Sequence, residues 1–142
     1  CAAVAAASIR TRESLRDTEQ RIADLALLGK QLDTYRKLKP VYDRYKASKD
    51  KEKFLRGFES EIILFEAAAR EIKKAGLTKL PSSDKVKAEL EGLSARKAAL
   101  QAELRKIQRE EKEYDTLRQN VDALLERPKE QEQQRQRSND LE

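Results

Sequence analysis

The feature that most constrains this chain is a line of apolar residues at every seventh position of its second half. The line consists of Val86, Leu93, Leu100, Ile107, Tyr114 and Val121. A heptad repeat of this length lies along one side of an α-helix and is typical of a coiled coil. A second line, four residues further on, is only half apolar: Leu90, Lys97, Leu104, Glu111, Arg118 and Leu125. The pattern predicts a long helix from Ser82 or Ser83 to about Glu126, with an imperfect packing seam.

A second long helix is predicted from about Ser8 to Ala47. Its apolar face consists of Leu25, Leu28, Leu32, Tyr35, Leu38, Tyr42 and Tyr45. Pro40 interrupts this stretch but does not change the phase of the pattern. We therefore expect a kinked helix, with a full break as the alternative.

A shorter helix is predicted from about Lys51 to Ala75. Its stripe consists of Phe54, Phe58, Ile62, Phe65, Ala69 and Ile72. Ser48 or Asp50 is expected to cap its first turn. Gly76 is expected to take the left-handed conformation that often follows a helix.

The composition agrees with an all-α fold. Charged residues make up 40% of the 142 residues and aromatic residues 5%, with only four Gly and three Pro. Such a composition is typical of long helices and coiled coils. We expect an elongated three-helix bundle over residues 1–126, with two long helices and one shorter one. Arg127-Pro128 is expected to end the third helix, and residues 127–142 are predicted to form a disordered, charged tail.

Helices of unequal length leave apolar side chains uncovered. In an up-down-up bundle the two long helices extend past the shorter one at both ends. The predicted interaction stripe at these ends consists of Leu15, Tyr114, Val121 and Leu125, with Ile9 also uncovered. Because the sequence has no initiator Met, we read it as part of a larger protein. Self-association or docking on the rest of that protein would cover the stripe.

Several functional classes find no support in the residues. The chain has no His, which excludes a His-metal site or a His base. Its one Cys excludes an internal disulfide and fits a reducing, cytoplasmic location. The sequence contains no run of about 18 apolar residues, so no membrane insertion is predicted. The acidic run at residues 110–115 is expected to be a solvated face. We therefore predict no catalytic residue, no metal site and no cofactor.

Tyrosines are interleaved with lysines and arginines in the stretch "TYRKLKPVYDRYK", residues 34–46. On a helix these tyrosines share the apolar face. Four cations recur every seven residues on a roughly opposite line: Lys30, Lys37, Arg44 and Lys51. The tyrosines are thus expected to form a bundle wall and the cations a basic ridge. The ridge is either a solvated face or a nucleic-acid-binding surface that contacts phosphates.

Three longer stretches carry a family resemblance. They are "RIADLALLGKQLDTYRKLKPVYDRYK", "FESEIILFEAAAREIKKAGLTKLPSSDKVKAELEGLSARKAAL" and "YDTLRQNVDALL". In this order they resemble the C-terminal helical region of relaxases, the mobilisation nucleases of integrative and conjugative elements in Gram-positive bacteria. Pro40 departs from the helical residue expected at its position. The resemblance implies a larger protein whose N-terminal domain nicks DNA with a tyrosine nucleophile and a histidine-bound metal. None of that motif matches residues of this chain.

The resemblance also implies what the chain does. Relaxase C-terminal regions are associated with relaxosome assembly, oligomerisation and recognition by the coupling protein. We therefore expect a non-catalytic protein-interaction domain in DNA mobilisation. Its partners would be a second copy, the parent relaxase domain, a relaxosome protein or the coupling protein. Two alternatives stay open: an accessory DNA-binding arm that uses the basic ridge, and a passive coiled-coil spacer.

Overall fold

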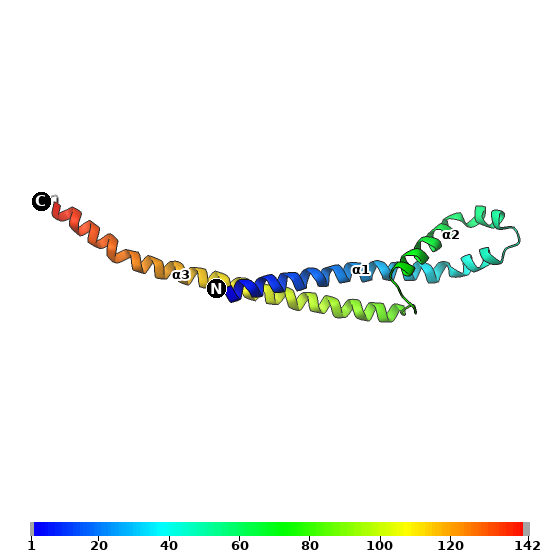
Figure 1. Ribbon diagram of the computed structural model, residues 1–142, viewed down its shortest axis with the longest axis horizontal. Helices are drawn as coiled ribbons and strands as arrows, with labels where there is room; N and C mark the ends of the chain where they lie inside the picture. The colour runs from blue at the N-terminus through cyan, green and yellow to red at the C-terminus, as the bar shows by residue number, and fades with distance from the viewer. Residues whose placement is uncertain (1, 141–142) are drawn as a thin grey trace. The chain divides into compact units, whose positions relative to one another are not determined.

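The chain is helical throughout nearly all the residues that the structure describes. The structure is a computed structural model, which describes the backbone of residues 2–140 and the side chains of residues 2–126. It contains the helices α1 (Ala2–Ala47), α2 (Lys51–Lys74) and α3 (Ser83–Asp140), and no β-strand within residues 2–140 (Figure 1). The predicted all-α fold with two long helices and one shorter one is confirmed. None of these helices is both long enough and apolar enough to cross a membrane.

The first helix, α1, is longer than predicted and continues through Pro40. It begins at Ala2 instead of Ser8, in a stretch rich in alanine, the residue with the highest helix propensity. Proline lacks the N–H that would bond to the carbonyl of Arg36, which costs a helix interior about 3 kcal/mol. The helix nevertheless runs to Ala47, so the alternative of a full break is wrong.

A short turn, residues 48–50, joins α1 to α2. Asp50 is the cap of α2, because the backbone N–H of Lys53 donates to its Oδ1 at 3.1 Å. Ser48, the other predicted cap, instead donates its hydroxyl to the Asp50 carbonyl oxygen at 3.1 Å. After the last turn of α2, Gly76 has a φ of 70°, the left-handed conformation predicted for it.

The connection between α2 and α3 is anchored on both sides. Ser82 caps α3, since the backbone N–H of Lys85 donates to the Ser82 Oγ at 3.1 Å. The guanidinium of Arg36, on α1, donates to the carbonyl oxygen of Pro81. Leu77 packs against the buried core. These contacts fix the path by which the chain enters α3.

The chain divides into two compact units. Residues 16–98, here called the hairpin unit, hold the second part of α1, all of α2 and the first part of α3. The residues up to 15 together with those from 99 onward, here called the terminal unit, hold the start of α1 and the rest of α3. Each unit has its own packing between helices.

The hairpin unit has a core to which all three helices contribute. Its buried members are Leu25, Leu32, Ile72 and Val86. Leu32 is 1% exposed. Gly29 allows a close approach of α3, because a Cβ there would lie 3.3 Å from Val86 Cγ1. The apolar spacing of the sequence thus predicted these four buried residues correctly, whereas in α2 it indicated Ala69 and the fully buried alanine is Ala68.

The heptad line of α3 forms the seam that packs against α1. Its buried or half-buried members are Val86, Leu93, Leu100 and Ile107. From Lys112 to Glu126 every residue is exposed. The predicted coiled-coil seam is therefore covered along most of its length and uncovered at its far end.

The α1 side of this seam is partly polar. Its positions, spaced four and three residues apart, are Val4, Ser8, Thr11, Leu15, Thr18, Ile22, Leu25, Gly29 and Leu32. Ser8, Thr11 and Thr18 are buried, with exposed fractions of 5%, 6% and 5%. Within the described residues, every buried side-chain nitrogen or oxygen has a hydrogen-bond partner. These small side chains let two helices pack closely without a fully apolar interface.

The third helix, α3, extends past its predicted end. Arg127-Pro128 does not stop it near Glu126, and its backbone is helical to Asp140. A proline removes one hydrogen bond, whereas the Lys, Glu, Gln and Arg that follow have good helix propensity. The predicted disordered tail, residues 127–142, lies outside the residues whose side chains the structure describes.

Candidate interaction surfaces

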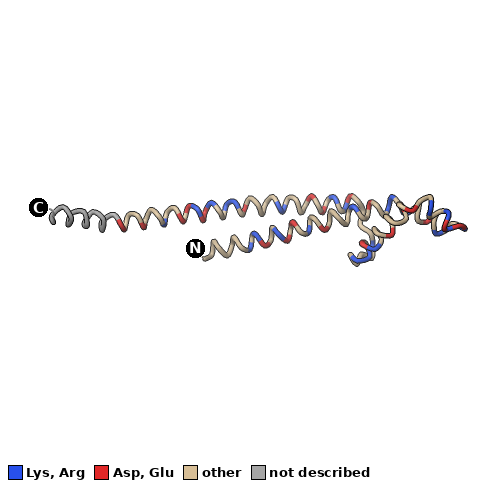
Figure 2. The backbone as a smooth tube through the Cα atoms, turned by 90° about the horizontal axis from the view of Figure 1, so that it is seen from above, with Lys and Arg blue, Asp and Glu red and all other residues tan. Residues whose placement is uncertain are grey.

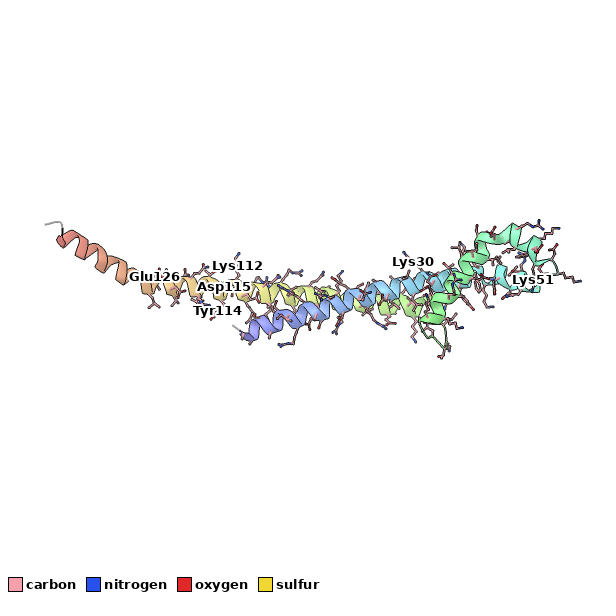
Figure 3. All side chains as sticks on the ribbon, turned by 45° about the horizontal axis from the view of Figure 1, so that its top comes forward. Lys30, Lys51, Lys112, Tyr114, Asp115 and Glu126 are labelled. Atoms are coloured by element: carbon pink, nitrogen blue, oxygen red, sulfur yellow. The ribbon has the colours of Figure 1, made fainter. Side chains whose placement is uncertain are left out.

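The exposed end of α3 carries a strip of large apolar side chains, here called the distal strip. Its members, with their exposed fractions, are Tyr114 (48%), Leu117 (62%), Val121 (45%), Leu124 (61%) and Leu125 (68%). Tyr114 projects from α3 on a different side from Lys112 (Figure 3). Three of the four predicted stripe residues, Tyr114, Val121 and Leu125, therefore lie together in this strip and are uncovered.

The distal strip faces another direction than the seam with α1. Along the covered part of α3, the residues three positions after the heptad line are all charged: Glu89, Arg96, Glu103 and Glu110. After Tyr114 and Val121 the same positions are Leu117 and Leu124. Beyond Glu111 apolar residues thus appear three residues after the first line, a step of about 100° around the helix from the four-residue offset, at which Leu125 remains. The four-residue offset, on which the predicted seam rests, does not reveal this change.

Leu15 and Ile9, near the start of α1, differ in how far their side chains are exposed. Leu15 is half-buried, because it occupies a seam position of α1 between Thr11 and Thr18. Ile9 lies off that seam and is 58% exposed. The expectation that Leu15 is uncovered is therefore wrong, whereas the same expectation for Ile9 is confirmed.

The four residues of the predicted basic ridge all have exposed side chains. Lys30 and Lys37 lie on α1, whereas Lys51 is the first residue of α2, at the far end of the hairpin (Figure 3). Arg44 lies near the end of α1, and its guanidinium carbon lies 5.6 Å from the ring centres of Phe54 and Phe58. Arg44 therefore contacts aromatic rings of α2.

The tyrosines of α1 pack against the phenylalanines of α2. Phe65 stacks between Tyr35 and Tyr42, with centroid distances of 4.8 and 4.3 Å. Tyr45 lies 6.1 Å from Phe54 between ring centres. Aromatic pairs of this kind stabilise by about 0.5–1.5 kcal/mol beyond the area they bury. The prediction that the tyrosines form a wall of the bundle is confirmed.

The predicted separation of cations from tyrosines is wrong at the end of α1. Lys46 Nζ lies 5.3 Å from the centre of the Tyr42 ring and 5.9 Å from that of Tyr45. Arg44 lies over the phenylalanines of the facing helix. Cations and aromatic rings therefore occupy the same surface here: Arg44 meets rings of α2, and Lys46 meets Tyr42, four residues before it on α1. The spacing along α1 carries no information about the rings of α2, but it does place Lys46 beside Tyr42.

Positive charge is concentrated where α1 turns into α2. Residues 36–56, here called the hairpin tip, hold nine Lys and Arg but three Asp and Glu, a net charge of +6. The whole chain has +5, so the remaining residues sum to −1. Lys and Arg occur on both arms of the hairpin (Figure 2).

One titratable pair lies within the hairpin tip. Lys39 Nζ donates to both carboxylate oxygens of Asp43, at 3.2 and 3.0 Å. This hydrogen bond and the charge of Asp43 raise the pKa of Lys39 above its ordinary value. Lys39 is therefore held in its charged form.

A groove of about 740 Å³ lies in the hairpin unit, beside the connection between α2 and α3. Leu25, Leu28 and Leu77 supply apolar lining. Arg21 and Glu89 line it too, and their side chains form a salt bridge of 2.8 Å. Among the residues that the structure describes, no group of three His, Cys, Asp or Glu could hold a metal ion. The groove brings together no evident acid–base or nucleophilic constellation.

No family model, no curated protein and no solved structure matches this chain. The candidate surfaces therefore rest on the residues and their geometry. They are the distal strip of α3 and the hairpin tip.

Proposed function

We propose that this chain is a non-catalytic protein-interaction domain that pairs through the distal strip of α3 with α3 of a second copy. The observation that carries the proposal is the change of the apolar line after Glu111. Along the seam with α1 the second line alternates apolar and charged residues (Leu90, Lys97, Leu104, Glu111), so a strip that only continued the seam would have an apolar residue at the next position. That position holds Arg118, and Leu117 is apolar instead. The strip therefore suits a helix other than α1.

The heptad pattern of the strip favours a parallel pair of identical helices. With Tyr114 and Val121 at the a positions, Leu117 and Leu124 occupy the d positions. A β-branched residue at a with Leu at d favours two-stranded parallel coiled coils. Only one of the two a positions is β-branched, so the preference rests on Val121.

The charges beside the strip support the same arrangement. Glu113 takes a g position and Arg118 the e position five residues later. In a parallel pair a g residue of one helix meets this e residue of the other, so each Glu113 would face an Arg118 of the second copy. The pairing is expected to be weak, because the strip extends over only about two heptads.

The resemblance to relaxase C-terminal regions supplies the cellular setting of the proposal. In that setting the pairing of two copies would contribute to the assembly of the DNA-transfer complex in the cytoplasm. A relaxosome protein or the coupling protein is the alternative occupant of the strip. Those partners would leave the purified chain monomeric.

Sedimentation equilibrium tests the pairing over a wide range of protein concentration. The wild-type chain is expected to form dimers, and the variant Leu117→Glu with Leu124→Glu to remain monomeric. Ile63→Glu with Leu64→Glu is the matched control, because these side chains of α2 are 54% and 55% exposed and lie outside the strip. The control is expected to dimerise like the wild type. A wild-type chain that stays monomeric, or a control that loses dimers equally, would contradict the proposal.

A further inference from the structure

Two cations of the hairpin tip lie at a helix end that does not favour positive charge, although Glu52 between them suits that end. Lys51 and Lys53 lie in the first turn of α2, directly after the cap Asp50. The N-terminus of a helix carries a partial positive charge, so cations there are repelled and acidic residues are preferred. Residues that break such a local rule are often retained for binding. Both lysines are among the nine cations that give the tip its net charge of +6.

The aromatic rings of the tip hold two of its cations in place. The Arg44 guanidinium lies over Phe54 and Phe58, and Lys46 lies over Tyr42. Cation–π contacts of this kind restrict where a long side chain points. The cations are thereby partly organised before any ligand arrives, which lowers the entropy lost on binding.

The surroundings of the tip favour a nucleic acid over a membrane surface. Helices that lie on membranes insert large apolar side chains below the lipid headgroups. The exposed large apolar residues of the described chain all lie outside residues 36–56. The tip is thus a charged surface with half-buried rings, including those of Tyr45 and Phe54. Clustered positive charge on a surface with no exposed large apolar side chain suits the phosphates of a nucleic acid.

We propose that the hairpin tip binds the phosphate backbone of single-stranded nucleic acid. Its cations lie on the end of α1, in the turn and on the start of α2. A flexible strand can follow cations around such a convex end, whereas a stiff duplex contacts one side of it. The contacts are to phosphates, so the binding is independent of base sequence. This proposal does not depend on the pairing through the distal strip.

Fluorescence anisotropy with a labelled oligothymidylate and the full chain tests the proposal. If the strand makes four phosphate contacts, the logarithm of the binding constant falls with the logarithm of salt concentration with a slope of roughly −3. A labelled duplex of the same length is expected to bind more weakly. Vesicles of phosphatidylcholine and phosphatidylserine, measured in parallel, are expected not to compete for the chain.

The decisive variant reverses three exposed charges of the tip: Lys49→Glu, Lys51→Glu and Lys53→Glu. Acidic residues at 51 and 53 suit the start of α2, so this variant is expected to keep its helical circular dichroism. The matched control reverses three exposed cations of α3: Arg105→Glu, Lys106→Glu and Arg109→Glu. Both variants change the net charge equally. The tip variant is expected to lose at least tenfold in affinity and the control less than threefold.

Each other outcome counts against the proposal. No measurable binding by the wild type, or binding insensitive to salt, would overturn it. Equal losses in the two variants would mean that net charge alone attracts the strand. Duplex binding as tight as that of the single strand, or effective competition by the vesicles, would assign the tip to a different ligand.

Discussion

Leu32 is the most completely buried large side chain among the described residues, and its environment sets a residue-scale prediction. Replacing it with alanine removes its packing against Leu25, Ile72 and Val86 in the core of the hairpin unit. Such a change in a core costs about 2–5 kcal/mol of unfolding free energy. We expect a loss of this size for Leu32→Ala in urea denaturation monitored by circular dichroism.

Leu27 provides the control for this measurement. It lies on the same helix, but its side chain is 56% exposed. Leu27→Ala is expected to change the free energy of unfolding by no more than about 0.5 kcal/mol. Similar losses for Leu27→Ala and Leu32→Ala would mean that the core of the hairpin unit is packed differently.

Single residues also show which contacts can be predicted from the sequence and which cannot. The burial of Leu25 and Leu32 follows from apolar spacing, which is a property of one helix. Ser8 and Thr11 are buried too, but a search for apolar residues passes over them. Their signal is the four-and-three spacing that they share with Leu15. Arg44 carries no such signal, because its ring partners belong to another helix.

At the scale of an element, the helix dipole of α2 predicts that Lys→Glu substitutions in its first turn and in its last turn change the free energy of unfolding in opposite directions. Lys51→Glu with Lys53→Glu places acidic groups near the positive end of the helix. The free energy of unfolding is expected to rise, by about 0.3–1 kcal/mol for each change at low salt. Thermal denaturation at low and high salt measures the effect, which salt should reduce.

Lys73→Glu with Lys74→Glu is the matched change in the last turn of α2. There the cations suit the negative end of the helix, and Lys74 also pairs with Glu71 at 3.3 Å. This variant is therefore expected to lower the free energy of unfolding. If both double variants changed the free energy of unfolding in the same direction, the interaction of these charges with the helix dipole would not explain the effect.

The long helix α3 shows what a heptad pattern can and cannot predict. The line from Val86 to Val121 correctly predicted a seam, since repeats of seven lie on one side of a helix. The point at which α1 ceases to cover it depends on how two helices align, which is set by side chains of both. The alternative second line at Leu117 and Leu124 is present in the sequence, however, and following both offsets would have revealed it.

At the scale of the whole molecule, the absence of histidine from the sequence leads to a prediction about pH. Histidine is the only side chain that ordinarily titrates between pH 5 and 8. The affinity for oligothymidylate is therefore expected to stay constant between about pH 5.5 and 7, while it falls steeply with salt. Anisotropy titrations at fixed ionic strength measure this, and a marked change within that range would count against binding by Lys and Arg.

The pair formed by Lys39 and Asp43 agrees with this expectation. Because Asp43 raises the pKa of Lys39, any stability from the pair is fully present below the ordinary pKa of lysine. It is lost only as the pH rises through the raised value, far above the tested range. The net charge of the whole chain is a poor guide to this surface, because a total of +5 conceals a tip of +6.

The charge of the hairpin tip also determines where the chain is open to proteolysis. Trypsin cuts after Lys and Arg, so the nine cations of the tip are cleavage sites, apart from Lys39, which Pro40 shields. A helix must unwind before a protease can cut it, and Pro40 removes one of the hydrogen bonds that resist unwinding. The turn at residues 48–50 is not helical, so Lys49 is the natural place for the first cut, and a strand bound there would delay it.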